Sequence, residues 1–139
     1  MRLTDFTDYG LRALMRLAGA PERLFTTDEI SAEFKISRNH LTKIVQALAQ
    51  AGFVTTLRGA GGGFRLARPA GEIGLGDVVR VLEERHALVE CFQTDGGGCL
   101  LTPRCRLKSK LAAARLAFYR ELDSWSLADC AFTPRKSAA

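Results

Sequence analysis

Apolar residues recur every three or four positions in several stretches of the chain, which is the spacing of one face of an α-helix. These stretches cover residues 3–18, 38–51, 75–84 and 106–125. A shorter helix is predicted over residues 27–34, because Thr26 and Glu29 form the sequence pattern of a capping box at its start. Ser37 is expected to cap the helix that begins at residue 38, and Gly52 is expected to end it.

A short hairpin follows residue 52. Residues 53–58 have the composition of a strand, residues 59–63 contain glycines suited to a turn, and residues 64–66 can pair back. A hairpin directly after two helices that are joined by a short turn is typical of a winged helix-turn-helix. We therefore predict a mainly α protein with a small β-hairpin, made of a winged helix-turn-helix domain and a long C-terminal dimerisation helix.

The second helix of the predicted helix-turn-helix has an apolar face and a polar, basic face. The N-terminal end of such a helix enters the major groove of DNA. Arg38 can form hydrogen bonds with guanine, and Asn39 or Gln46 can form them with adenine. Lys43 is expected to contact phosphate. His40 is expected either to contact DNA or to pack within the protein. The candidate DNA-binding residues are Ser37, Arg38, Asn39, His40, Thr42, Lys43 and Gln46 of this helix, with Arg58, Gly62, Gly63 and Arg65 of the wing.

Positive charge is concentrated in the same part of the chain. The net charge is +5, and residues 34–71 contain no Asp or Glu. The basic residues of this span are Lys35, Arg38, Lys43, Arg58, Arg65 and Arg68. Such a block fits binding to nucleic-acid phosphates, with a solvated basic face as the alternative. No nucleophile with a matched base is evident, so we expect no enzymatic activity.

Three of the four cysteines lie in one glycine-rich loop. Seven residues separate Cys91 from Cys99, five separate Cys99 from Cys105, and glycines occupy positions 96–98. A flexible loop can fold three thiolates onto one centre, and thiolates are the usual ligands of iron–sulfur clusters. A structural zinc site is the alternative, although zinc ligands are commonly spaced more closely.

Two further residues bear on this loop. His86 lies five residues before Cys91 and is either a rival fourth ligand or an exposed residue at a helix end. Cys130 falls outside the loop and is expected to be a bystander thiol.

The helix over residues 106–125 carries an apolar seam with the spacing of a coiled coil. The residues of this seam are Leu107, Leu111, Phe118, Leu122 and Trp125. The seam either packs on its own domain or forms a dimer interface. We favour the dimer, because a DNA-binding protein of this kind usually binds a palindromic site as a two-fold symmetric dimer.

The chain divides into four predicted segments. They are the winged helix-turn-helix domain at 1–72, the connecting helix and cysteine loop at 73–106, the dimerisation helix and a last turn at 107–130, and a tail at 131–139, frayed from Thr133. No apolar run reaches the roughly 20 residues that cross a bilayer, and the first residues show no secretory signal. We therefore expect a cytoplasmic protein with no membrane contact. Because the cytoplasm is reducing, four cysteines there indicate metal or redox chemistry rather than disulfides.

Several motifs, in order along the chain, resemble the NsrR group of bacterial repressors, in the winged-helix family that also contains IscR and RirA. They are MRLTDFTDYGLRALMRLA at the start, SRNHLTKIVQALAQAGFV, the wing RGAGGGFRLARP, GDVVRVLE and LTPRCRLK. The resemblance runs from Met1 to about Asp129. It implies a homodimer that binds a palindromic operator in double-stranded DNA under the control of an iron–sulfur cluster.

The same resemblance implies a signal and a set of ligands. In this group nitric oxide destroys the cluster by nitrosylation, DNA binding is lost, and genes for nitric oxide detoxification are expressed. Cys91, Cys99 and Cys105 match the three cysteine ligands, and Asp8 matches an aspartate that the other protomer supplies as the fourth. The cluster is expected to be 4Fe–4S, with 2Fe–2S as the alternative. Asp8 also has a plainer interpretation, as an acid in the first turn of a helix.

The chain fits the subgroups unevenly. IscR-like proteins have a histidine three residues after the last cysteine, where this chain has Lys108. The gap between Cys91 and Cys99 is longer than is common in NsrR and resembles RirA, an iron-responsive regulator. Asp8 and the stretch TPRCR over residues 102–106 look like NsrR. We therefore expect a nitric-oxide-sensitive repressor, with an iron-responsive iron–sulfur regulator as the alternative.

Overall fold

The structure is a computed structural model that describes residues 1–136, and within them it is mainly helical. The helices are α1 (Asp5–Ala18), α2 (Thr27–Phe34), α3 (Arg38–Gln50), α4 (Leu75–Glu83) and α5 (Arg106–Asp123). The strands β1 (Val54–Leu57) and β2 (Gly63–Leu66) form one antiparallel hairpin. Short 3-10 turns are η1 (Ala70–Glu72), η2 (Glu90–Phe92), η3 (Thr102–Arg104) and η4 (Leu127–Cys130). The predicted mainly α fold with a small hairpin is confirmed.

Local capping positions the helix-turn-helix. The Thr26 hydroxyl accepts the Glu29 N–H at 3.1 Å, and the Glu29 carboxylate accepts the Thr26 N–H at 2.8 Å, which closes the capping box of α2. Lys35 ends α2 in the left-handed region at φ 55. The Ser37 hydroxyl then accepts the His40 N–H at 3.1 Å and starts α3. These signals are short-range, which explains why the sequence predicts these boundaries closely.

One hydrophobic core joins α1, α2, α3, the hairpin, α4 and η4. Its fully buried residues include Leu14, Phe25, Ile30, Leu41, Ile44, Leu48, Ile73, Val78 and Leu127. Val78 and Leu82 lie on α4, and Leu127 lies on η4. The core therefore extends past residue 72, the predicted end of the DNA-binding domain. The predicted division of the chain into four segments stays a prediction.

The hairpin is attached to the segment between α1 and α2. Phe25 and Phe64 exchange both backbone hydrogen bonds, at 2.9 and 2.8 Å. Gly63 has φ 156, and a Cβ atom there would clash with the Phe25 carbonyl oxygen. This close backbone approach fixes where β2 lies against the helices.

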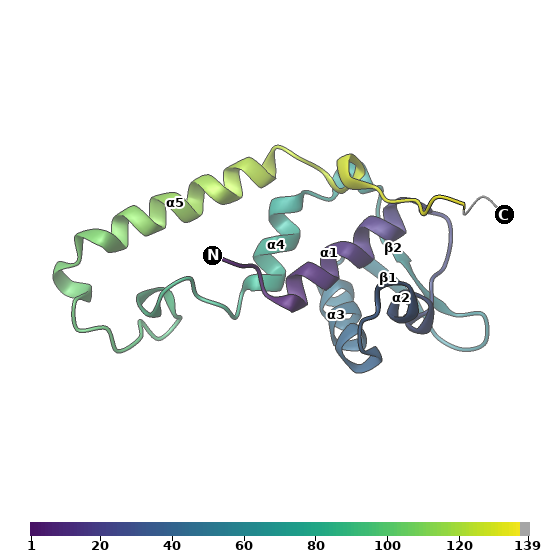
Figure 1. Cartoon of the computed structure of the whole chain (residues 1–139), viewed down its shortest axis with the longest axis horizontal. Helices are drawn as coiled ribbons and strands as arrows, with labels where there is room; N and C mark the ends of the chain where they lie inside the picture. The colour runs from purple at the N-terminus through teal and green to yellow at the C-terminus, as the bar shows by residue number, and fades with distance from the viewer. Residues whose placement is uncertain (137–139) are drawn as a thin grey trace.

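α5 extends away from the core, with the segment that carries the cysteines connecting it to α4 (Figure 1). No residue of α5 is buried. After α5 the chain returns to the core through η4, and the Phe132 N–H donates to the Met15 carbonyl at 2.9 Å. No described helix is long and apolar enough to cross a membrane.

The predicted tail is attached at its start. The rings of Phe132 and Phe34 have centroids 6.4 Å apart, and the Thr133 hydroxyl donates to the Gly19 carbonyl at 3.3 Å. The prediction that the chain frays from Thr133 is therefore wrong at its first residue. Residues 137–139 of the predicted tail lie outside the described residues.

Candidate nucleic-acid interface and cysteine loop

α3 presents the predicted polar face to solvent. Its exposed residues include Arg38, Asn39, Thr42, Lys43 and Gln46, and its buried ones are Leu41, Ile44, Val45 and Leu48. The apolar face holds the helix in the core, so the polar face is free to contact another molecule. Its role in DNA binding stays a prediction.

Arg38 makes a weak contact that the sequence analysis did not predict. Its Nε lies 3.1 Å from Asp28 Oδ1, and the two side chains are 70% and 69% exposed. Exposed ion pairs of this kind contribute between nothing and about 1 kcal/mol. Arg38 can therefore leave Asp28 for a DNA base with little loss of stability.

His40 packs against α1. Its ring centroid lies 5.9 Å from that of Phe6 and 5.5 Å from that of Tyr9, edge-on in the second case. Of the two roles left open for His40, the contacts within the chain favour packing. The N-terminal turn of α3, where DNA contact is predicted, is thus held by aromatic side chains of α1.

The glycines of the wing divide into two kinds. Gly59 and Gly61 have φ values of 94 and 73, and a Cβ atom there would meet nothing within 4 Å. A Cβ at Gly62 would clash with the Leu57 carbonyl, and Gly63 lies against Phe25 as described above. Gly62 and Gly63 are thus needed by the hairpin itself, while the open tip is formed by Gly59 and Gly61, which the sequence analysis did not single out.

Basic side chains flank this tip. Arg58 and Arg65 are exposed beside it, as predicted. Arg68 lies over the Phe53 ring, with its guanidinium carbon 5.4 Å from the ring centroid. The hairpin and α3 together present exposed basic and polar groups.

The cysteine loop is held by few polar contacts. Cys91 lies in η2, Cys105 is the N-cap of α5, and Cys99 follows the glycines; all are free and half-buried, as is Cys130. The Glu90 carboxylate accepts the Gly98 N–H at 2.9 Å and so folds the loop back on itself. Glu90 was not predicted to have a role, because a contact across eight residues of loop has no sequence signature.

The cysteine loop fits an iron–sulfur cluster in the chemistry of its donors, since it carries three free thiols separated by glycines. However, within residues 1–136 no three His, Cys, Asp or Glu side chains converge on one point. His86 is exposed. The predicted ligands therefore come together only if the loop changes its conformation.

Asp8 is engaged within its own helix. Its carboxylate accepts two hydrogen bonds from Arg12, from Nε at 3.0 Å and from Nη2 at 2.7 Å. The hydrogen bond that Arg12 donates to Asp8 is the main cause of the raised pKa of Arg12. In the described chain Asp8 is thus an acid of the first helical turn, paired with the residue one turn later.

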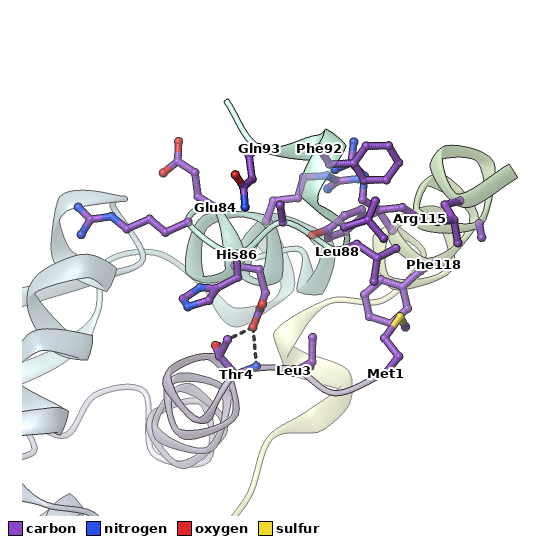
Figure 2. A pocket seen from close by; sticks show the side chains of 18 of the residues that line it. Met1, Leu3, Thr4, Glu84, His86, Leu88, Phe92, Gln93, Arg115 and Phe118 are labelled. Atoms are coloured by element: carbon purple, nitrogen blue, oxygen red, sulfur yellow. Dashed lines mark hydrogen bonds between the residues drawn. The ribbon is translucent and has the colours of Figure 1, made fainter. Parts of the chain in front are cut away.

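A groove of about 1490 Å³ lies between the start of α1, the end of α4, the cysteine loop and α5 (Figure 2). Its apolar lining includes Met1, Leu88, Phe92, Leu111 and Phe118. The groove is larger than the roughly 300–1,000 Å³ of small-molecule pockets. Its size suits a segment of protein better than a small ligand.

The predicted seam of α5 is divided between this groove and solvent. Leu111 and Phe118 are half-buried and line the groove, and Leu122 is half-buried. Leu107 and Trp125 are 60% and 50% exposed. Leu116, which the seam did not include, is 49% exposed.

Glu83 connects the end of α4 to the start of α1 beside the groove. Its carboxylate accepts the Thr4 N–H at 2.8 Å and the Thr4 hydroxyl at 2.7 Å, the hydrogen bonds drawn in Figure 2. Burial alone would raise the pKa of Glu83, but hydrogen bonds from the Thr7 and Thr4 side chains and the Thr4 backbone hold it below its ordinary value. The α4 end that leads into the cysteine loop is thereby joined to α1.

Comparison with known proteins identifies the family. The sequence model of the Rrf2 family, described as an iron-dependent transcriptional regulator, matches residues 3–132. The chain belongs to the Rrf2 family. Rrf2 proteins are transcriptional regulators and not enzymes, and they bind DNA and typically act as dimers.

Solved structures support the same fold for this Rrf2 chain. Staphylococcus aureus CymR is 27% identical with a TM-score of 0.71, over 96% of this chain and 100% of that one. CymR of B. subtilis, described as its global cysteine regulator, is 28% identical with a TM-score of 0.71, over 96% and 99%. T. potens IscR is 28% identical with a TM-score of 0.69, over 93% and 85%. These likenesses support the winged-helix Rrf2 fold and do not single out the NsrR subgroup.

Proposed function

We propose that this Rrf2 regulator binds palindromic operator DNA as a homodimer, with α3 and the wing as its reading surface. The observation that carries the proposal is the exposed polar and basic face of α3, together with the exposed Arg58 and Arg65 of the wing that follows it in the chain. A helix held in the core by its apolar face can lay its other face in the major groove. The acid-free span over residues 34–71 supplies the positive potential that phosphates require.

The dimer is proposed to form through α5. This helix has no buried residue, and its large apolar side chains Leu107, Leu116 and Trp125 are about half exposed or more. The groove beside α5 is also apolar in part and of the size of a protein segment. A second copy that covers these surfaces would gain the free energy of apolar burial. It would also place two α3 helices on two half-sites.

The cysteine loop is proposed as the sensor. Cys91, Cys99 and Cys105 would hold an iron–sulfur cluster, 4Fe–4S in the first instance, with Asp8 of the partner subunit as the fourth ligand. When bound, the cluster would supply a centre that reacts with nitric oxide. The glycines at 96–98 allow the loop to close around it. Because Cys105 is the N-cap of α5, a change in the loop acts directly on the proposed dimer helix.

Asp8 would need to change partner. Both of its carboxylate oxygens accept from Arg12 in the described chain. A carboxylate that leaves this guanidinium for a metal exchanges one positive partner for another, so Arg12 competes directly with ligation. Replacement of Arg12 is therefore expected to favour ligation by Asp8.

Nitric oxide is the proposed signal, with iron availability as the second candidate. The second candidate is supported by the longer gap between Cys91 and Cys99 and by the description of the family as iron-dependent.

The test is a titration of anaerobically purified protein with nitric oxide, in which visible absorbance and operator binding are followed together. We expect both to fall in step. DNA binding that ignores nitric oxide but follows iron supply would favour the iron-responsive alternative. A colourless protein that contains zinc would replace the iron–sulfur proposal with a structural zinc site.

A further inference from the structure

α5 is held to the core by a two-point ion pair near its C-terminal end. Arg80 of α4 donates from Nη1 to Asp123 Oδ1 at 2.7 Å and from Nη2 to Asp123 Oδ2 at 2.6 Å. The same guanidinium lies over the Tyr119 ring, 4.7 Å from its centroid. We call Arg80, Tyr119 and Asp123 the α4–α5 clasp. Two parallel hydrogen bonds and a stacked ring fix the orientation of α5 relative to α4, whereas a single contact would allow α5 to pivot.

The backbone around the clasp is shaped to receive it. A Cβ atom at Gly76 would clash with Asp123 Oδ1, so only glycine leaves room for the carboxylate. Next to it, the Leu75 N–H donates to the Trp125 carbonyl at 3.0 Å, and the Leu127 N–H donates to the Ile73 carbonyl at 2.8 Å. The start of α4 and the end of α5 thus meet through main-chain hydrogen bonds as well as through the ion pair.

Because α5 is long, a small change in its angle at the clasp moves its far end by a large distance. Its 18 residues make a helix about 27 Å long. A rotation of about 7° at the clasped end would move the far end by about 3 Å, close to the rise of one DNA base pair. No residue of α5 is fully buried, so packing within the chain opposes such a rotation less than it would for a helix of the core.

We propose that the α4–α5 clasp sets the angle between α5 and the DNA-binding half, and thereby determines which spacing of half-sites the dimer accepts. The inference rests on the proposed function, because it needs two chains that pair through α5 on DNA. Arg80 and Asp123 act here as positioning residues, through the direction of α5. The pKa of Asp123 is lowered, chiefly by its hydrogen bonds from Arg80, as expected for a pair that holds both partners charged.

The experiment measures spacing preference directly. Duplexes are first selected from a randomised library with the wild-type protein, and the chosen site is then rebuilt with its spacer lengthened or shortened by single base pairs. Binding of the wild type is expected to fall about tenfold or more for one base pair of change. Asp123→Asn keeps the size of the side chain but removes its charge, and it is expected to reduce this discrimination to about threefold or less.

A second variant and a control complete the design. Arg80→Lys keeps the charge but lacks the planar fork, so it should broaden the spacing profile in the same direction. Glu121→Gln is the matched control, an acid-to-amide change on the same helix outside the clasp, and it should keep the wild-type profile. Affinity for a single half-site, and dimer mass in solution, should be unchanged in all three variants.

The outcomes separate the inference from the function on which it rests. If both clasp variants discriminate between spacer lengths as strongly as the wild type does, the inference is overturned and the proposed function stays intact. Equal loss of binding at every spacing would also overturn it, since the clasp would then only hold the fold together. A wild-type protein that selects no paired half-sites would overturn the proposed function and the inference with it.

Discussion

The proposed DNA-binding half (α1 to α4 with the hairpin) and the proposed sensor half (the cysteine loop and α5) are organised by different contacts. In the first, α1 to α4 and the hairpin share one core, where residues such as Leu14 and Ile44 are fully buried. In the second, α5 has no buried residue, and the cysteine loop is held by contacts such as that between Glu90 and Gly98. Burial within the chain determines the shape of the first half, while the second keeps large apolar side chains exposed, which the proposed second copy would cover.

This difference suits a sensor. A segment with few buried apolar contacts can change conformation for a small free-energy change, whereas a packed core resists partial change. The reading surface can therefore stay folded while the loop gains or loses a ligand. Each of the following predictions asks whether the two halves are separable in this way.

Removal of one thiol is expected to have the largest effect on the proposed sensor half and little effect on the fold of the other half. Cys99→Ala is expected to abolish stable cluster binding, because the loop offers no replacement thiolate. The thermal unfolding midpoint should equal that of the cluster-free wild type, because Cys99 lies outside the core. Iron content and visible absorbance of anaerobically purified protein measure the first effect. Cys130→Ala is the matched control and should stay brown; a brown, nitric-oxide-responsive Cys99→Ala would end the ligand assignment.

The stability of the two halves should differ by several kcal/mol in a matched pair of truncations. Ile44→Ala removes a fully buried side chain and is expected to lower the free energy of unfolding by about 2–5 kcal/mol. Leu116→Ala on α5, where the side chain is half exposed, should lower it by less than about 1 kcal/mol and weaken the dimer instead. Urea unfolding at low protein concentration and sedimentation measure these effects, and equal unfolding losses would contradict the comparison.

Within the DNA-binding half, base readout and phosphate contact should be separable. Arg38→Ala is expected to reduce the preference for operator over random DNA by about 1–3 kcal/mol, because a bidentate contact to guanine is lost. Lys43→Ala should weaken binding to all sequences and lower the salt slope of the binding constant by about 1. Titrations at several salt concentrations distinguish them. Equal losses on operator and random DNA would mean that Arg38 contacts only phosphate.

The smallest effect is expected where the halves meet, at Glu83. Its pKa in the folded chain lies below the ordinary value of 4.5, so its ionised form stabilises the fold above that pH. This contribution is lost as the pH falls below 4.5 through the lowered pKa. Glu83→Gln should therefore cost less than about 1 kcal/mol at neutral pH, after solvent screening, and less still in acid. Unfolding at pH 7 and pH 3 tests this, with Glu84→Gln as the control; an equal cost at both would disprove it.

The sequence predicted well what depends on near neighbours. The capping of α2 by Thr26 and of α3 by Ser37 involves residues three positions apart, and the buried stripe of α3 follows helical spacing. Such signals are local, so they can be recognised without knowledge of the fold.

Contacts between distant residues could not be predicted in the same way. The Phe25–Phe64 bridge and the Arg80–Asp123 pair join residues 39 and 43 positions apart, and each depends on how the helices pack. The cysteines show the limit most clearly. Their chemistry can be recognised from their number and from the glycines between them, but a loop with so few contacts has no pattern that predicts how they are arranged.

The start of α5 has a consequence for helix–coil equilibrium. Cys105 is its N-cap without a side-chain hydrogen bond, and the first turn contains no acid but does contain Arg106 and Lys108. Cations near the positive end of a helix dipole destabilise it by about 0.3–1 kcal/mol each. This turn is therefore less stable than a turn with acids in these positions, and a negative charge held at Cys105 would stabilise its helical form. The charge that the loop carries beside Cys105 would thus act on the first turn of α5.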